Sequence, residues 1–198
     1  MQKPNYWNHN TAYYKWLKEQ VKNSKEILDV GCGDGSLVAF LDDNSKNITG
    51  IDPDQSCINK TNLLNTSKKV QFIREDFESF ESIKRYDSII FVASIHHMEM
   101  SMALKKAKSL LSQNGKLLIV GLARPSTMTD YIIEILRVLP SSVISKIKKM
   151  HSSEDENIPV SYNLMKMSEV RKLLFNLFPN SKIRQGLFYR YLFEGFNR

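Results

Sequence analysis

The chain has 198 residues, of which 42% are hydrophobic, so it is large enough to bury the core of one globular domain. No window approaches the roughly 18 consecutive apolar residues of a membrane-spanning helix, and no apolar signal core follows Met1. The two cysteines, Cys32 and Cys57, are too few for a disulfide framework or a metal cluster, which favours a reducing compartment. We therefore expect a single cytoplasmic domain over residues 1–198, with no metal site and no membrane span.

The chain is basic, with a formal net charge of +7 at pH 7 and an isoelectric point of about 9.3. Such a charge is compatible with nucleic-acid binding. The lysines and arginines are nevertheless dispersed along predicted helix faces, which is typical of a solvated surface. Nucleic acid is therefore the disfavoured partner, and a small acidic or amphipathic molecule is preferred.

The most informative segment is a glycine turn between a strand and a helix. Residues 27–30 form a short apolar run that predicts a buried parallel strand, and residues 36–41 have the apolar spacing of a helix. The turn between them contains Gly31, Gly33 and Gly35, which permit a positive φ and the close approach of a ligand. No lysine follows the last glycine, as a phosphate loop requires, and the third glycine comes one residue too early for a dinucleotide fingerprint.

Acidic residues accompany the first three predicted strands. Asp29 lies at the tip of the first strand, Asp52 follows the strand over residues 47–51, and Asp76 follows the strand over residues 70–73. A carboxylate roughly 20 residues after such glycines is where a ribose diol is bound in nucleotide-binding folds. The sequence therefore predicts a site for a nucleoside-like ligand.

The alternation of strands and helices continues along the chain. Further strands are predicted over residues 86–94, 116–122, 181–187 and 189–196, and further helices over residues 102–111 and 168–178. Gly115 is expected to end the first of these two helices. This alternation predicts a mostly parallel sheet with helices on both faces.

The segment Asp29-Val-Gly-Cys-Gly-Asp-Gly35 resembles the first motif of class I S-adenosylmethionine-dependent methyltransferases, and the resemblance covers about residues 24–122. It implies a doubly wound, mostly parallel seven-stranded sheet whose last strand is antiparallel and inserted beside the fifth. The regions around residues 8–17 and 177–192 are also similar to small stand-alone members of this family. The resemblance implies S-adenosylmethionine as the cofactor, with Asp29 at its methionyl ammonium, Asp52 at its ribose and Asp76 at its adenine. The cofactor-binding positions that it implies are Asp29, Gly31, Cys32, Gly33, Gly35, Asp52, Pro53, Asp76, Phe77, Ala93 and Ser94.

The resemblance leaves the methyl acceptor open. The Asn/Asp-Pro-Pro-Tyr/Phe signature of base N-methylases is absent after the fourth strand, where the chain reads Ser94-Ile-His-His97. We expect a small-molecule acceptor with an oxygen or nitrogen nucleophile. His96 is the candidate general base, with a pKa near 6.5, and His97 is expected to fix the loop by hydrogen bonding to the backbone. The alternatives are an RNA methyltransferase, a degenerate cofactor-binding or scaffold domain, and methyl transfer in which neither histidine is catalytic.

Two segments are candidates for covering the site. Residues 1–23 are rich in aromatic side chains and are expected to form a lid helix, with packing on the sheet as the alternative. Residues 122–162 are longer than a usual strand-to-helix connection and are expected to form a helical insert over the cleft. The alternative roles of this insert are additional core and a dimerisation surface, so both a monomer and a homodimer are compatible with the sequence.

Overall fold

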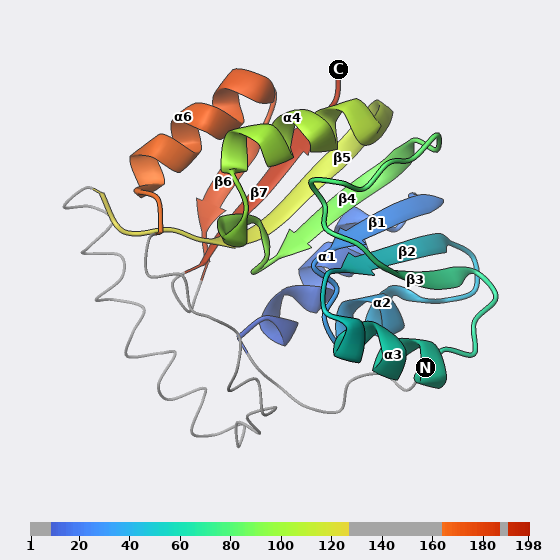
Figure 1. Cartoon of the computed structure of the whole chain (residues 1–198). Helices are drawn as coiled ribbons and strands as arrows, with labels where there is room; N and C mark the ends of the chain where they lie inside the picture. The colour runs from blue at the N-terminus through green and yellow to red at the C-terminus, as the bar shows by residue number, and fades with distance from the viewer. Residues whose placement is uncertain (1–8, 127–163, 187–189) are drawn as a thin grey trace.

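The computed structural model describes residues 9–126, 164–186 and 190–198, which are built around a seven-stranded sheet (Figure 1). The strand order is β3-β2-β1-β4-β5-β7-β6. The strands are β1 (Glu26–Val30), β2 (Asn47–Asp52), β3 (Val70–Arg74), β4 (Tyr86–Val92), β5 (Leu111–Leu122), β6 (Lys182–Gln185) and β7 (Arg190–Phe196).

The pairing of the strands confirms the predicted topology. β1 lies between β2 and β4 and is parallel to both, β3 is parallel to β2, and β5 is parallel to β4. β7 runs antiparallel between β5 and β6, with Leu122 of β5 opposite Arg190 of β7. β1 is buried almost throughout, as expected of a parallel strand that is covered on both faces.

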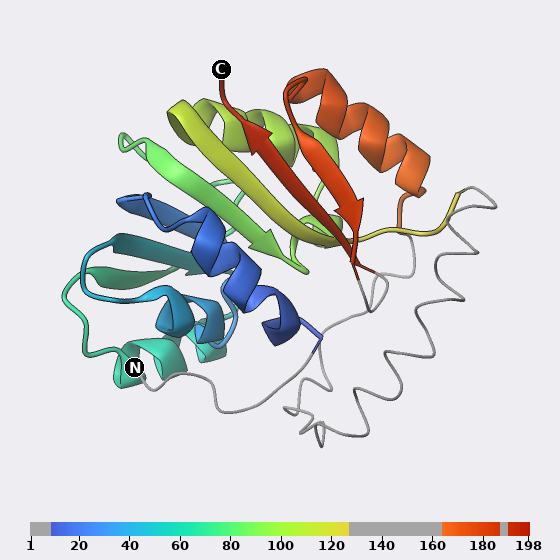
Figure 2. The ribbon, with the colours of Figure 1, turned by 180° about the vertical axis from the view of Figure 1, so that it is seen from behind.

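Helices cover both faces of the sheet. α4 (Met100–Leu110) and α6 (Met167–Leu177) lie side by side on one face (Figure 1). α1 (Tyr14–Gln20), α2 (Ser36–Leu41) and α3 (Gln55–Leu64) contribute apolar side chains to the core on the opposite face, which Figure 2 shows from behind. In α4 the buried residues recur every three or four positions, which gives one apolar stripe against the sheet: Met100, Ala103, Leu104, Ala107 and Leu110.

The connection from α4 to β5 differs from the sequence-based expectation. The helix ends at Leu110 and the strand begins directly at Leu111. The left-handed residue in this segment is Asn114, with a φ of 60°, while Gly115 has no positive φ. A Cβ on Gly115 would lie 2.9 Å from the carbonyl oxygen of Ser112. Gly115 is therefore required for a close approach of two backbone segments, and the prediction that it stops the helix is wrong.

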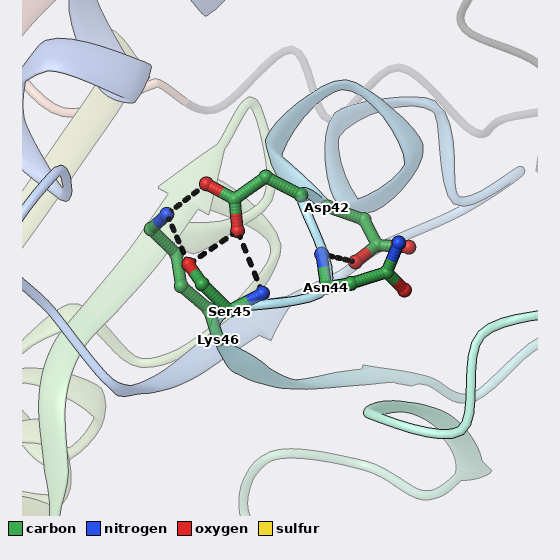
Figure 3. A network of polar contacts seen from close by, with 5 residues as sticks. Asp42, Asn44, Ser45 and Lys46 are labelled. Atoms are coloured by element: carbon green, nitrogen blue, oxygen red, sulfur yellow. Dashed lines mark hydrogen bonds and ion pairs between the residues drawn. The ribbon is translucent and has the colours of Figure 1, made fainter.

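A polar network fixes the turn between α2 and β2 (Figure 3). The carboxylate of Asp42 accepts from the backbone N–H of Asn44 at 3.0 Å, and that of Asp43 accepts from the N–H of Ser45 at 3.0 Å. The ammonium of Lys46 forms an ion pair with Asp43, and this hydrogen-bonded pairing, led by the Lys46 contact, holds the pKa of Asp43 well below its usual value. The turn thus sets the start of β2.

The two predicted covering segments are only partly described. The N-terminal segment forms a short 3-10 helix, η1 (Thr11–Tyr13), followed by α1, while residues 1–8 lie outside the described residues. Tyr14 and Leu17 are buried in the core, so α1 packs on the sheet. Most of the predicted insert over residues 122–162 lies outside the described residues. Over the described ranges, no helix combines the length and apolar character needed to cross a membrane.

Candidate active site

The predicted site residues gather at the carboxyl ends of the central parallel strands. The chain passes from β1 to β2 on one side of β1, whereas β4 pairs on the other side. Such a reversal of strand order opens a crevice at the carboxyl edge of a doubly wound sheet, where ligands bind. The loop after β1, Asp52 at the end of β2 and the segment after β4 all lie at this edge.

The glycine loop has the backbone that the sequence predicts, since Gly31, Gly33 and Gly35 have φ values of 74°, 50° and 70°. A Cβ on Gly31 would lie 2.5 Å from the Cβ of Ser94, so this glycine is required by the neighbouring loop. A Cβ on Gly33 would meet no atom within 4 Å. Gly33 therefore borders open space, and a ligand can approach the backbone at this position.

Asp52 links the glycine loop to the end of β2. Its Oδ2 accepts from the backbone N–H of Gly33 at 2.9 Å, and its Oδ1 accepts from the N–H of Asp54 at 2.9 Å. Each carboxylate oxygen can accept a second hydrogen bond, and the side chain is half-buried. Asp52 is thus held in a fixed orientation and can still accept from a ligand hydroxyl.

Asp29 is a buried carboxylate beside two other acids. Its side chain is 2% exposed, and its Oδ2 has no hydrogen-bond partner in the described part of the chain. Burial, followed by the charges of Asp52 and Asp34, raises the pKa of Asp29 to about 7. A cationic group of a ligand at this place would relieve both the missing partner and the repulsion between the carboxylates.

The predicted adenine-binding residues have different environments. Asp76 is exposed after β3, and its carbonyl oxygen accepts from the N–H of Phe80 at 2.9 Å. The ring of Phe77 is buried and packs edge-on against Phe91, with a centroid distance of 5.3 Å. Phe77 therefore belongs to the core, and only its main chain is left for a ligand. Pro53 is exposed beyond the end of β2.

The side chains of Cys32 and Ser94 support the loop from below. The N–H of Cys32 donates to the carbonyl of Ile51 at 3.0 Å, and burial raises the pKa of its thiol. Ser94 is buried, and its hydroxyl donates to the carbonyl of Val30 at 2.6 Å, which joins the segment after β4 to the end of β1. Ala93 has a φ of 53°, an unusual backbone conformation for a residue other than glycine. Such local strain is often found at functional sites.

The two histidines lie in a second 3-10 helix, η2 (Ile95–His97), directly after β4. His96 is half-buried, and its Nδ1 is buried without a hydrogen-bond partner among the described residues. Burial, then the neighbouring charges of His97 and Arg190, lowers the pKa of His96 to about 4. The expected pKa near 6.5 is therefore wrong for the ligand-free protein, because the sequence does not show how far the ring is desolvated.

His97 differs from its expected structural role. Its side chain is exposed and its ring lies 4.1 Å from the ring of His96, measured between centroids. The hydrogen bond that fixes the loop comes from the backbone N–H of His97, which donates to the carbonyl of Ser94 at 3.1 Å. The imidazole of His97 therefore borders His96 and does not itself anchor the loop.

Sequence reasoning missed Arg190, which it counted only among the dispersed basic residues. Arg190 is the first residue of β7 and is half-buried opposite Leu122. Its Nε and Nη2 donate to the Oδ1 of Asn10 at 3.1 and 2.7 Å. Burial lowers the pKa of Arg190 to about 10, although Tyr13 acts in the opposite direction. A signal was available, because a strand that returns antiparallel beside the fifth begins at the carboxyl edge of the sheet.

A metal centre finds no support in this site. Across the three described stretches of the chain, no group of three or more histidine, cysteine, aspartate or glutamate residues is placed to hold a metal ion. The candidate site is thus a glycine loop flanked by carboxylates on one side and by His96 and Arg190 on the other.

The strand order, the glycine loop after β1 and the acids at the strand ends define the class I methyltransferase fold, the class that uses S-adenosylmethionine as methyl donor. Residues 6–173 match a family profile described as a methyltransferase domain, and the chain belongs to this family. The expected class of enzyme and cofactor is thus confirmed.

Relatives agree with this assignment. An uncharacterized methyltransferase of Mycobacterium tuberculosis is 27% identical over 191 residues, which cover 94% of each protein. A probable (S)-tetrahydroprotoberberine N-methyltransferase of Papaver bracteatum is 29% identical over 110 residues, which cover 52% of this chain and only 30% of the plant protein. The plantazolicin methyltransferase BpumL, solved with a pentazolic substrate analogue and SAH, superposes with a TM-score of 0.65 at 21% identity, over 94% of this chain and 84% of BpumL. This last likeness concerns the fold.

Proposed function

We propose that this protein transfers the methyl group of S-adenosylmethionine to an oxygen or nitrogen atom of a small-molecule acceptor. The observation that carries the proposal is the unpartnered Asp29 beside the open space at Gly33. S-adenosylmethionine brings an ammonium and a sulfonium to this site, and both positive charges are stabilised by a carboxylate. A nucleotide with phosphate groups would instead be repelled by Asp29, Asp34 and Asp52.

The cofactor roles follow from the contacts of each residue. Asp29 binds the methionyl ammonium, directly or through water, and Gly33 leaves room for the methionyl chain. Asp52 accepts from the ribose hydroxyls while keeping its hydrogen bond to the loop. Asp76 and the backbone N–H of Phe77 bind the edge of the adenine ring.

The chemistry is an in-line displacement at the methyl carbon. The bond from the acceptor to the methyl group forms as the carbon–sulfur bond breaks, and sulfur leaves as a neutral thioether. The sulfonium supplies the electrophile, so the protein binds, orients and excludes water. A protonated nucleophile releases its proton to solvent or to the Nδ1 of His96, which lies after β4 at the same edge.

The covering segments and the cellular setting are part of the same proposal. Residues 1–23 close over the acceptor side, which is supported by the hydrogen bonds between Asn10 and Arg190. The insert over residues 122–162 covers the cleft as a helical segment. The two free cysteines, of which Cys32 is buried, support a reducing, cytoplasmic setting.

The test combines binding with a turnover screen. Calorimetry should show that the purified protein binds S-adenosylmethionine and SAH without added metal. The protein is then incubated with methyl-labelled cofactor and separate pools of small metabolites, RNA and protein. We expect label in the small-molecule pool alone. Label on RNA would instead establish the RNA methyltransferase, and absence of cofactor binding would establish a degenerate domain.

A further inference from the structure

A positively charged cluster lies on the acceptor side of the site. It consists of Arg190 at the start of β7, Asn10 before η1 and His96 in η2. Three distant parts of the chain thus meet, because β7 returns antiparallel and begins beside the carboxyl end of β5. The proximity of His96 and Arg190 is evident from the influence of the guanidinium on the imidazole pKa.

The guanidinium of Arg190 is held in place but its charge is not balanced by Asn10. The amide oxygen of Asn10 accepts from both Nε and Nη2, which fixes the plane of the guanidinium. An amide carries no net charge, so these bonds orient the cation without neutralising it. The side chain is also half-buried, and its lowered pKa shows that the surroundings stabilise the cation less well than water does.

The neighbouring imidazole adds no second positive charge at physiological pH. With a pKa of about 4, His96 is neutral, and its unpartnered Nδ1 is available to a polar ligand group. The two sides of the site therefore differ in charge. Asp29 and Asp52 make the cofactor side negative, while Arg190 makes the acceptor side positive. A ligand that fits both sides presents cations to the loop and an anion to β7.

We propose that the methyl acceptor carries a carboxylate, which pairs with the guanidinium of Arg190 and thereby selects acidic acceptors. Arginine and carboxylate match in geometry, and charge-assisted pairs of this kind are strongest where water is excluded. The inference rests on the proposed methyl transfer to a small molecule and adds the chemical class of the acceptor.

A structural role of Arg190 makes a different prediction. If the guanidinium only clasps Asn10 and so holds the N-terminal segment on the sheet, loss of either partner should have the same effect. If the charge recognises the acceptor, Arg190 and Asn10 should separate, because only Arg190 carries the charge.

The experiment compares matched acids and neutral analogues. The probes are hydroxy- and aminobenzoic acids and pyridine carboxylic acids, each with its methyl ester and its primary amide. Labelled methyl transfer is measured at saturating S-adenosylmethionine, and binding of the same probes is measured with SAH in place. We expect kcat/KM for the accepted acids to exceed that of their esters by about tenfold or more.

Four variants separate the roles. R190Q should lower kcat/KM for acids by about 10²-fold, mainly through KM, and leave the esters nearly unchanged. R190K should keep part of the preference, because it retains the charge but not the fork of donors. N10A should keep the ratio of acid to ester. R184Q is the matched control, since Arg184 is exposed on β6, and its turnover should equal that of the wild type.

Two results would overturn the inference. No preference for acids over esters and amides in the wild-type protein would show that the site does not select a carboxylate. Equal loss of the preference in N10A and R190Q would show that the clasp, and not the charge, is responsible. SAH affinity is measured for every variant, so failure of cofactor binding in the wild type is recognised separately as failure of the proposed function.

Discussion

Replacing Asp29 by asparagine should stabilise the ligand-free protein at neutral and alkaline pH, relative to acidic pH, while it removes cofactor binding. Asp29 is a buried carboxylate without a partner on Oδ2, and its pKa rises from 3.8 to about 7 on folding. Between these two pH values the folded state holds a proton that the unfolded state has released. The free energy of unfolding therefore falls as the pH rises through this window, and it levels off above pH 7.

The size of the effect follows from the shift. A difference of about three pKa units corresponds to about 4 kcal/mol across the whole window, of which about 2.7 kcal/mol falls between pH 5 and pH 7. Asparagine does not titrate, so D29N lacks this loss. The buried amide introduces an offset of about 1–3 kcal/mol, which is the same at every pH. The diagnostic quantity is thus the slope of the difference between the two proteins.

Urea unfolding at several pH values from 5 to 8.5, without ligand, measures this slope. D87N is the matched control: although burial opposes it, hydrogen bonds from the N–H groups of Lys25 and Glu26 hold the pKa of Asp87 below its usual value, so its contribution is lost only under more acidic conditions. Calorimetry with SAH at pH 8 should show binding to D87N and none to D29N. A difference between D29N and wild type that does not change with pH would refute the reasoning.

The remaining predictions concern the loop and the two histidines. Gly33→Val should abolish SAH binding in calorimetry yet leave a folded protein, because the side chain enters open space at a positive φ. Asp52→Ala should weaken SAH binding by about 1.5–3 kcal/mol, whereas Asp54→Ala, at the exposed cap of α3, should only lower the melting temperature. His96→Ala should lower turnover by about 10²-fold with SAH affinity intact if its imidazole accepts the proton, and His97→Ala should raise the pKa of His96 as followed by NMR, because it removes a nearby charge. Wild-type turnover of His96→Ala across pH 6 to 9 would show that positioning alone carries the step.

The cofactor side of the site is predictable from the sequence because its signals are local. Gly31, Gly33 and Gly35 follow one strand within a few residues, and their positive φ values are those that the pattern requires. Asp52 ends the next strand, and parallel strands bring such ends to the same edge. The order of the strands follows from the alternation of elements, and the position of the antiparallel strand follows from the family resemblance. The ligand roles of these residues remain predictions.

The acceptor side is not predictable in the same way because it depends on tertiary contacts. Asn10 and Arg190 are separated by 180 positions, and no local pattern connects them. The pattern places Phe77 after a strand but does not tell whether its ring faces a ligand or Phe91. The pKa of His96 depends on burial and on its neighbours in space, which spacing along the chain does not reveal.

The position of β7 between β5 and β6 also sets the order in which the protein can mature during synthesis. The strands β1 to β4 and the glycine loop precede α6 along the chain, so the cofactor half can form while later residues are still inside the ribosome. β6 leaves the ribosome before β7, yet β7 is its only strand neighbour in the described sheet. β6 therefore remains an unpaired edge until Arg190–Phe196 inserts, and the same insertion delivers Arg190 to the acceptor side. A nascent chain thus acquires the capacity to hold its methyl donor before it acquires selectivity for what is methylated.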